Sequence, residues 1–291
     1  MANSLRTVQL RIASTKSTAQ ITKAMHMVSQ SKLKKSEKTY KSYQDFMNRI
    51  EDMTCQIISK TPDDYIHPLI QKREIKKTAY LIITSDRGLA GAYNSSLFKA
   101  FEERITQKHN SYEEFVISAI GKKGFAYINK KKYTLISDEP IYVRDDVMFV
   151  DIEPLARKII DSYLNKEIDN LVIVYNHYVN TLTQEITFKE ILPIDNLEKK
   201  AASVDYIYET GIEKTLDLLL PMYIKDILYG IILDAKISEH SARMNSMKNA
   251  TDNAEEVIEK LQLLYNRARQ SAITTELIDI IGGANAIGGD N

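Results

Sequence analysis

The six prolines of this chain all lie between residues 62 and 221, which leaves a long stretch near each end without any helix breaker. Residues 1–61 contain neither proline nor glycine, and the same is true of residues 231–281. Proline costs a helix interior about 3 kcal/mol and glycine about 1 kcal/mol, so both stretches can form uninterrupted helices. Such helices would be roughly 77 to 92 Å long, whereas a compact globule of this size is about 50 Å across. We therefore expect two helices that extend out of a globular body.

The two ends carry opposite charge, although the whole chain balances at 39 basic and 39 acidic residues. Residues 1–60 hold eleven Lys and Arg against four Asp and Glu, and residues 205–291 hold eight against fourteen. Ends of opposite charge that flank an inserted domain favour pairing as an antiparallel coiled coil. A basic helix alone could also indicate a nucleic-acid or membrane surface. Because the acidic end supplies a counterion within the chain, we expect no nucleic-acid partner.

Apolar residues recur every three or four positions where the two ends adjoin the middle of the chain. These residues are Tyr43, Phe46, Met47, Ile50, Met53 and Ile57 on one side, and Ile224, Ile227, Leu228, Ile231 and Ala235 on the other. Farther out the repeat turns polar and small, with Thr15, Thr18, Ala19 and Thr22 facing Ser238, Ser241, Asn245 and Asn249. An apolar face then returns at Leu261, Leu264, Ala268, Ile278 and Ile281. An exposed apolar helix needs a partner surface, so we expect other chains to enclose this end.

The middle of the chain alternates between short apolar runs and amphipathic stretches. Strands are expected at 78–84, 114–121, 133–137, 170–176 and 184–193, and helices from a cap near Asn94 and Ser95, at 124–129 and at 148–164. Strand, helix, strand in this order predicts an α/β layer with a mainly parallel sheet. The expected organisation is a helix at 1–60, a Rossmann-like α/β domain at 76–200 and a helix with a tail at 205–291.

The motifs of nucleotide and metal chemistry are missing from this α/β domain. The first turn after a strand, residues 85–91, is neither GxGxxG nor GxxxxGK[ST], and residues 121–124 lack the spacing as well. The five histidines form no metal-ligand pair, and Ser85 and Asp86 lie in no nucleophile elbow. Cys55 is the only cysteine, so no disulfide can form within the chain. We expect no catalytic residue, no cofactor and no metal, with the glycines of 85–91 serving a tight turn.

Three segments carry a family resemblance. They are Ile21-Thr22-Lys23-Ala24-Met25 with Met27-Val28-Ser29 and Ser31-Lys32-Leu33, then Ser85-Asp86-Arg87-Gly88-Leu89, and finally the run from residue 238 to residue 286. That run ends in Ile273-Thr274-x-Glu276-x-x-Asp279-x-x-x-Gly283-Ala284-x-Ala286, a highly specific signature. On these motifs the chain closely resembles the γ subunit of F-type ATP synthases over essentially its whole length. It departs from the family at His26, where lysine is frequent, and at Ala90, where many members have cysteine.

The resemblance implies a central rotor shaft that couples proton flow through the membrane sector to ATP synthesis or hydrolysis by rotation. It implies no bond chemistry by this chain alone. The implied partners are the α and β subunits, which form a collar around the shaft, together with the ε subunit and the c-subunit ring. The implied location is peripheral, on the cytoplasmic face of the cell membrane, with membrane association only through the complex. The resemblance places the collar contacts at Arg269, Gln270, Arg243, Met25 and Glu276.

Two other classes of function remain as alternatives. A stand-alone α/β nucleotide-binding enzyme with helical extensions would turn over nucleotide as an isolated chain. A coiled-coil scaffold or nucleic-acid binder that uses the basic end would show salt-dependent retention on DNA. The shaft interpretation predicts neither behaviour.

Overall fold

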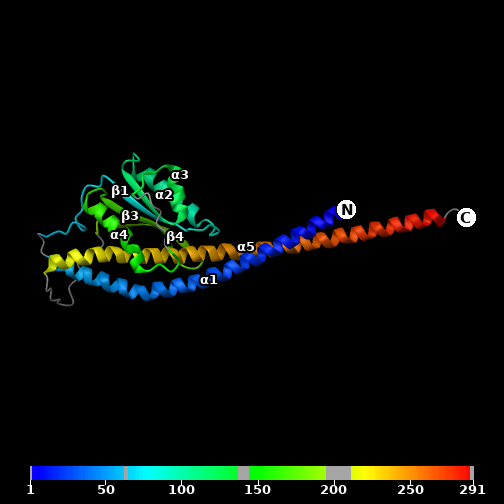
Figure 1. Cartoon of the computed structure of the whole chain (residues 1–291), viewed down its shortest axis with the longest axis horizontal. Helices are drawn as coiled ribbons and strands as arrows, with labels where there is room; N and C mark the ends of the chain where they lie inside the picture. Colours follow the sequence, from blue (N-terminus) through cyan, green and yellow to red (C-terminus); the bar gives the residue numbers. More distant parts are fainter. Residues whose placement is uncertain (1, 62–64, 137–143, 195–210, 289–291) are drawn as a thin grey trace. The chain divides into compact units, whose positions relative to one another are not determined.

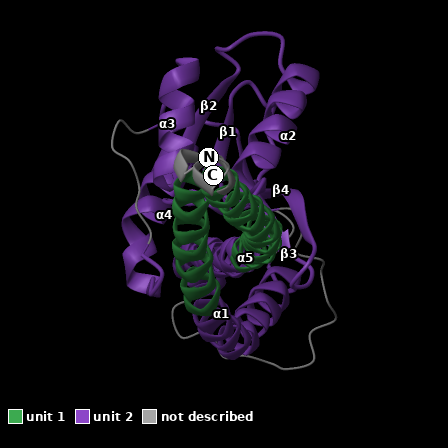
Figure 2. Ribbon diagram, turned by 90° about the vertical axis from the view of Figure 1, so that its right-hand side faces the viewer, with its two compact units in different colours: residues 1–28, 244–291 green, residues 29–243 purple. Residues whose placement is uncertain are grey.

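The structure, a computed structural model, describes residues 2–61, 65–136, 144–194 and 211–288 (Figure 1). Its elements are α1 (Ala2–Ser59), β1 (Thr78–Ile83), α2 (Tyr93–Lys108), β2 (Phe115–Ile120), α3 (Lys122–Lys131), α4 (Phe149–Leu164), β3 (Asn170–Tyr178), β4 (Gln184–Leu192) and α5 (Ile212–Gly288). Residues 1–28 and 244–291 form one compact unit, called unit 1, and residues 29–243 form another, called unit 2 (Figure 2). The expected domain boundaries at 200 and 205 lie outside the described residues.

The sheet of unit 2 has four strands in the order β2-β1-β3-β4. β1 pairs in parallel with β2, where Thr78 lies opposite Phe115, and with β3, where Thr78 lies opposite Asn170. β4 pairs antiparallel with β3, because the short connection between them leaves no room for a crossover. All residues of β1 and β2 are buried, as expected for parallel strands that are covered on both faces. The prediction of a mainly parallel sheet in an α/β fold with long terminal helices is confirmed.

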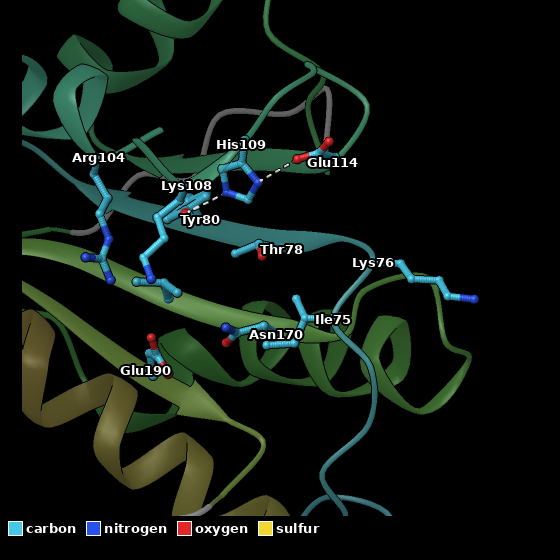
Figure 3. Close-up of a pocket in the computed structure, with 11 residues that line it drawn as sticks. Ile75, Lys76, Thr78, Tyr80, Arg104, Lys108, His109, Glu114, Asn170 and Glu190 are labelled. Carbon is cyan, nitrogen blue, oxygen red and sulfur yellow. Dashed lines mark hydrogen bonds and ion pairs between the residues drawn. The ribbon is translucent and has the colours of Figure 1, made fainter. Parts of the chain in front are cut away.

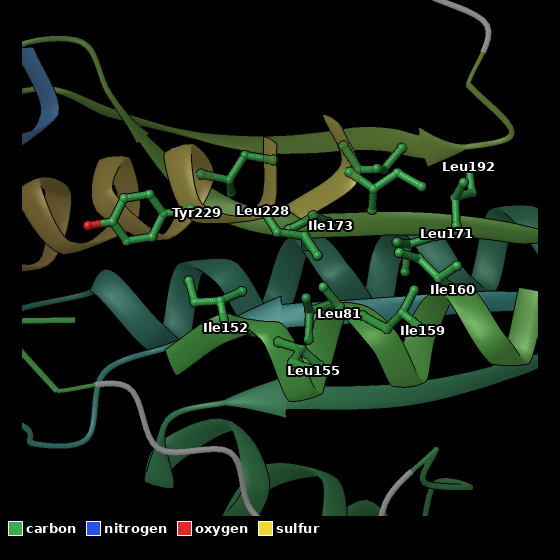
Figure 4. Packing of buried hydrophobic residues seen from close by; sticks show 14 of the residues in the cluster. Leu81, Ile152, Leu155, Ile159, Ile160, Leu171, Ile173, Leu192, Leu228 and Tyr229 are labelled. Carbon is green, nitrogen blue, oxygen red and sulfur yellow. The ribbon is translucent and has the colours of Figure 1, made fainter. Parts of the chain in front are cut away.

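A separate apolar core covers each face of this sheet. On one face Tyr80 and Ile82 of β1 pack with residues of α2 and α3. On the other face Leu81 packs with α4 and with the parts of α1 and α5 that belong to unit 2 (Figure 4). The alternation follows from the period of two in a strand. The long helices of unit 2 therefore share one core with the α/β sheet.

Within unit 2 the helices α1 and α5 run antiparallel, as the sequence predicts. Tyr40 of α1 lies near Asp234 of α5, and farther along α1 Cys55 lies near Tyr223, which is earlier in α5. The two helices approach closely at Gly230, where an added Cβ atom would lie 2.5 Å from the terminal methyl carbon of Met47. The absence of a side chain at 230 therefore makes room for the Met47 thioether.

Unit 1 consists of the outer parts of the same two helices, shown in green in Figure 2. Its interface is polar at the point where Thr22 and Thr251 are both buried and their hydroxyl oxygens lie 2.7 Å apart. Each hydroxyl oxygen also lies within hydrogen-bond distance of a carbonyl of its own helix, that of Ala19 for Thr22 and that of Met247 for Thr251. Because each hydroxyl has one proton, one of the two donates to its carbonyl while the other donates across the seam. The predicted small, polar seam is confirmed at Ala19 and Thr22, which are buried, but Thr18 and Asn249 are exposed, and Ser238 and Ser241 belong to unit 2.

Two local predictions were wrong in detail. The expected strand at 133–137 is only a single bridge between Leu135 and Ile117, and residue 137 lies outside the described residues. Asn94 does not cap α2, because its amide bonds to Ser85 instead. α5 begins at Ile212 and continues through Pro221. Burial of the neighbouring Leu219, Leu220, Tyr223 and Ile224 offsets the cost of a proline in the helix.

Candidate partner-binding surface

The turn at residues 85–91 uses its own polar groups, which leaves little to bind a phosphate. The Ser85 backbone N–H donates to Asn94 Oδ1 at 3.1 Å, and the Ser85 hydroxyl donates to the Arg87 carbonyl at 2.7 Å. Asp86 Oδ1 accepts the Lys122 backbone N–H at 2.9 Å. Gly91 has a φ of 59°, which favours glycine, so the prediction of a tight turn is confirmed there. Within the described ranges, no group of three His, Cys, Asp or Glu side chains could hold a metal ion.

Arg243, one of the expected collar contacts, ties this turn to α5 within unit 2. Its guanidinium donates to Glu239 Oε1 at 2.8 Å and to the carbonyls of Arg87 at 3.3 Å and Gly88 at 3.5 Å. Only 11% of the Arg243 side chain is exposed. Charge-assisted bonds to an acidic partner and to two carbonyls hold the guanidinium in one orientation. Arg243 therefore holds the turn in place. Leu89 lies at the exposed end of that turn, where it is 63% exposed and has a φ of 62°.

A cluster of charges that the sequence analysis missed lies next to Arg243. Asp145 binds Lys32 of α1 at 2.5 Å and lies 3.7 Å from Lys236 and 3.8 Å from His240, both on α5. Burial alone would raise the pKa of the Asp145 carboxyl, but the bond from Lys32 and the nearby His240 and Lys236 outweigh it, so this pKa is lowered. The signal in the sequence was the pair Lys236 and Glu239, spaced three apart in a helix and 3.4 Å apart in the structure.

The other expected contacts belong to unit 1. Arg269, Gln270 and Glu276 are all exposed on α5. Arg269 and Glu276 are seven residues apart, which places them on one side of the helix two turns from each other. Met25 lies on α1 and is half-buried. Because Thr22 contacts Thr251, Met25 lies about 20 residues before Arg269 along α5, or roughly 30 Å. The structure therefore brings Arg269, Gln270 and Glu276 together and places Met25 elsewhere in unit 1.

An apolar surface surrounds these three residues at the end of α5. It comprises Ile273, Leu277, Ile278, Ile280 and Ile281, which are between 48% and 63% exposed. No residue from Glu276 to Ala284 is buried or half-buried. Five large apolar side chains within nine residues, mixed with Arg, Gln and Glu, are typical of a protein-binding surface. We call residues 269–281 the α5 tip surface.

No helix in the described part of the chain is long and apolar enough to cross a membrane. The apolar segment around Pro221 lies in α5, with Tyr223, Ile224 and Leu228 in the core of unit 2. The apolar character of that segment is therefore explained by packing against the sheet.

Comparison with known proteins gives one consistent result. Residues 4–287 match the family described as ATP synthase. The chain is 40% identical over 289 residues to the ATP synthase gamma chain of Exiguobacterium sp., which covers 98% of this chain and 99% of the relative. Its fold is similar to a chain of the Euglena gracilis mitochondrial ATP synthase in rotational state 3, with a TM-score of 0.69, 18% identity and coverage of 100% and 97% of the two chains. It is also similar to a chain of the Tetrahymena thermophila mitochondrial ATP synthase central stalk and c-ring, with a TM-score of 0.60, 23% identity and coverage of 79% and 99%.

The structural similarity supports the fold, and the sequence match over nearly the full length supports the family. The predicted resemblance is confirmed on both counts. This chain belongs to the ATP synthase γ-subunit family.

Proposed function

We propose that this chain is the central shaft of an F-type ATP synthase and transmits rotation between the proton-driven membrane sector and the nucleotide sites of the collar. The observation that carries this proposal is the full-length match to a gamma chain, combined with an α5 tip surface that has no partner within the described chain. The α and β subunits would enclose unit 1. The c-subunit ring and the ε subunit would bind unit 2, as the central stalk and c-ring of the Tetrahymena complex suggest.

The asymmetry of unit 1 supports a coupling role. Its part of α1, residues 1–28, holds four basic and no acidic residues, whereas its part of α5, residues 244–288, holds four basic and six acidic residues. A pair of helices with different charge presents a different surface at each angle of rotation. As the shaft rotates, each subunit of the collar contacts one of these surfaces after another. The differences in contact energy shift the conformational equilibrium of that subunit. Rotation would then exchange the preferred state among the nucleotide sites.

The chain itself would catalyse no reaction under this proposal, and it would lie at the cytoplasmic face of the cell membrane, held there by the complex. The absence of catalysis is supported by the 85–91 turn, whose polar groups are hydrogen-bonded to other groups of the chain. Arg269, Gln270 and Glu276 would contact the collar directly, with Met25 at a second level of unit 1. Arg243 would act through the turn that it holds.

The test is reconstitution with purified α and β subunits. A fluorescent probe would be attached at Lys99→Cys, an exposed site on α2, in a Cys55→Ser background. We expect the isolated chain to hydrolyse no ATP and the complex to show ATP-dependent stepwise rotation of the probe. A chain truncated after residue 243 lacks the part of α5 in unit 1 and serves as the control. ATP turnover by the isolated chain, or equal rotation of the truncated form, would contradict the proposal.

A further inference from the structure

A polar cavity of about 310 Å³ lies in unit 2 at the amino ends of β1 and β3 (Figure 3). Thr78 and Asn170, the first residues of these strands, line it from the sheet. Arg104 and Lys108 of α2 line it from one side, and Glu190 of β4 lines it from another. The cavity is at the opposite end of the strands from the 85–91 turn. Its volume falls at the lower end of the range of small-molecule sites.

Two cations in this cavity have no acidic partner. Arg104 and Lys108 are four residues apart on α2 and therefore share one side of the helix. Neither makes an ion pair with any residue that the structure describes, and the Arg104 guanidinium lies 5.4 Å from the centroid of the Phe188 ring. Like charges one turn apart destabilise a helix, and an anion between them would remove that repulsion. The α2 side of the cavity is therefore suited to an anion.

On the sheet side of the cavity, one hydrogen-bond acceptor has no donor among the described residues. Asn170 is only 6% exposed, and its Oδ1 has no hydrogen-bond partner among the described residues. Buried carbonyl oxygens are nearly always hydrogen-bonded, so this one calls for a donor. Glu190, which pairs with Val172 across the sheet, supplies a second acceptor in the same cavity. A ligand with an N–H or O–H group could satisfy both.

Three other polar side chains of the cavity, those of Tyr80, His109 and Glu114, are already engaged with one another. The Tyr80 hydroxyl lies 2.9 Å from His109 Nε2, and His109 Nδ1 lies 3.5 Å from Glu114 Oε2. Figure 3 shows this chain of three side chains along the upper side of the cavity. The Lys76 side chain points away from the cavity in the same view. The groups left for a ligand are two cations, one carboxylate and one amide oxygen.

We propose that this cavity binds a small organic anion, either a carboxylate or a phosphate monoester, that also carries an amino or hydroxyl donor. The anionic group lies between Arg104 and Lys108, where the guanidinium can form two parallel hydrogen bonds. The donor group binds Asn170 Oδ1 and the Glu190 carboxylate. Inorganic phosphate bound between Arg104 and Lys108 has no second, separate group to donate to Asn170 and Glu190, so we expect the site to favour the organic anion.

The experiment is calorimetric titration of the full-length chain with three probes, namely AMP, L-glutamate and inorganic phosphate. We expect saturable binding of one organic probe at one site per chain, at least tenfold tighter than phosphate. The AMP and glutamate titrations distinguish the phosphate monoester from the carboxylate. Arg104→Gln combined with Lys108→Gln should raise the Kd for that probe at least tenfold. Asn170→Ser should remove most of the preference over phosphate.

The matched control is Lys99→Gln, which removes a cation from the exposed side of α2 outside the cavity and should leave the Kd unchanged. Circular dichroism of each variant verifies that the helices and sheet are intact. Three results would overturn the proposal: no saturable binding of either organic probe at millimolar concentration, no preference over phosphate, or equal binding by the parent and the Arg104 and Lys108 variant. If neither organic probe binds, we would infer instead that Arg104 and Lys108 pair with an acidic side chain of a partner subunit.

Discussion

The same two helices are supported in different ways in the two units. In unit 2, α1 and α5 contribute Ile57, Leu220, Leu228 and Ile232 to a core that includes the sheet and α4, and each of these four is at most 2% exposed. Among the described residues of unit 1 the buried ones are few and mostly small or polar, namely Val8, Ala19, Thr22, Met247, Thr251 and Ala254. Helices in proteins gain most of their stability from tertiary packing. Unit 2 supplies that packing itself, whereas unit 1 leaves the α5 tip surface to be covered by other chains.

The largest expected effect tests the core of unit 2. Leu228→Ala should lower the free energy of unfolding by about 2 to 5 kcal/mol, because it removes buried apolar area and leaves a cavity in the core. Leu277→Ala makes the same chemical change at a side chain that is 54% exposed in unit 1, and it should cost no more than about 0.5 kcal/mol. Urea unfolding followed by circular dichroism measures both. Equal losses of unfolding free energy in the two variants would show that the two units do not differ in how packing stabilises their helices.

The second prediction concerns the activity of the assembled complex and not the stability of the chain. Arg269→Ala combined with Gln270→Ala should lower ATP turnover and proton coupling of the assembled complex, with subunit stoichiometry unchanged. Loss of a charge-assisted contact of about 1.5 to 3 kcal/mol corresponds to roughly a tenfold loss or more. Arg267→Ala is the control, since this exposed arginine lies on the same helix within one turn. Normal turnover and coupling in the double variant would make the two residues ordinary surface groups.

Truncation of the α5 tip surface tests whether Arg269 and Gln270 make the main contact with the collar. Removal of residues 276–291 deletes Glu276 and four of the apolar side chains but keeps Arg269 and Gln270. We expect a smaller loss of turnover than in the double variant, because apolar contacts at a helix end are spread over many side chains. Turnover measured with the reconstituted complex, alongside co-purification of the α and β subunits, compares the two. A larger loss on truncation would place the main contact beyond residue 275.

The third prediction uses pH and concerns unit 2. Burial lowers the pKa of His67, His109 and His240 from 6.5, because removal from water disfavours the charged imidazolium in the folded chain. Below pH 6.5 the unfolded chain binds protons first, and stability therefore falls as the pH falls from that value toward the folded pKa. Each such histidine can contribute a slope of up to about 1.4 kcal/mol per pH unit.

Urea unfolding at pH 7.5 and at pH 5.5, values chosen about one unit on each side of 6.5, measures this slope. His240→Gln should reduce it, since His240 is only 2% exposed and neither ring nitrogen has a hydrogen-bond partner among the described residues. The parent chain, measured at the same two pH values, is the control. An unchanged slope in His240→Gln would show that this side chain does not carry the effect.

The smallest expected effect belongs to the polar seam of unit 1. Thr22→Val alone removes one hydroxyl of the buried pair and should cost about 0.5 to 1.5 kcal/mol. Thr22→Val with Thr251→Val replaces both hydroxyls by methyl groups of similar shape, and it should recover most of that loss. Hydrogen exchange of the amides near residues 22 and 251 reports on these changes locally. A double variant that is less stable than the single one would show that the seam depends on its hydrogen bond.

Much of the secondary structure could be predicted from local features. The breaker-free residues 1–61 form α1, and the apolar runs at 78–84, 114–121, 170–176 and 184–193 all form strands. The prediction failed where tertiary packing decided the outcome. Asn94 has the chemistry of a cap but bonds to Ser85 across the turn.

The candidate sites were less predictable than the fold. The signature at 273–286 identified the family, because its residues are adjacent in the chain, and the sequence predicted Ile278 and Ile281 of the α5 tip surface as part of an exposed apolar face. Arg243 is different, since its role depends on the carbonyls of residues 87 and 88, which only the fold brings to α5. Arg104, Asn170 and Glu190 have no common motif and meet only through the register of the sheet.

The sequence by itself determined the two long helices, the α/β order of the middle, the missing phosphate motifs and the family, because each depends on residues close together in the chain. Tertiary structure decided which parts of α1 and α5 belong to a self-sufficient core and which are left exposed. It also decided which charges are paired, as Asp145 is with Lys32, and which line a cavity without an ion pair among the described residues, as Arg104 and Lys108 do. Burial and ion pairing depend on distances between side chains that are far apart in sequence, and those distances exist only in the folded chain.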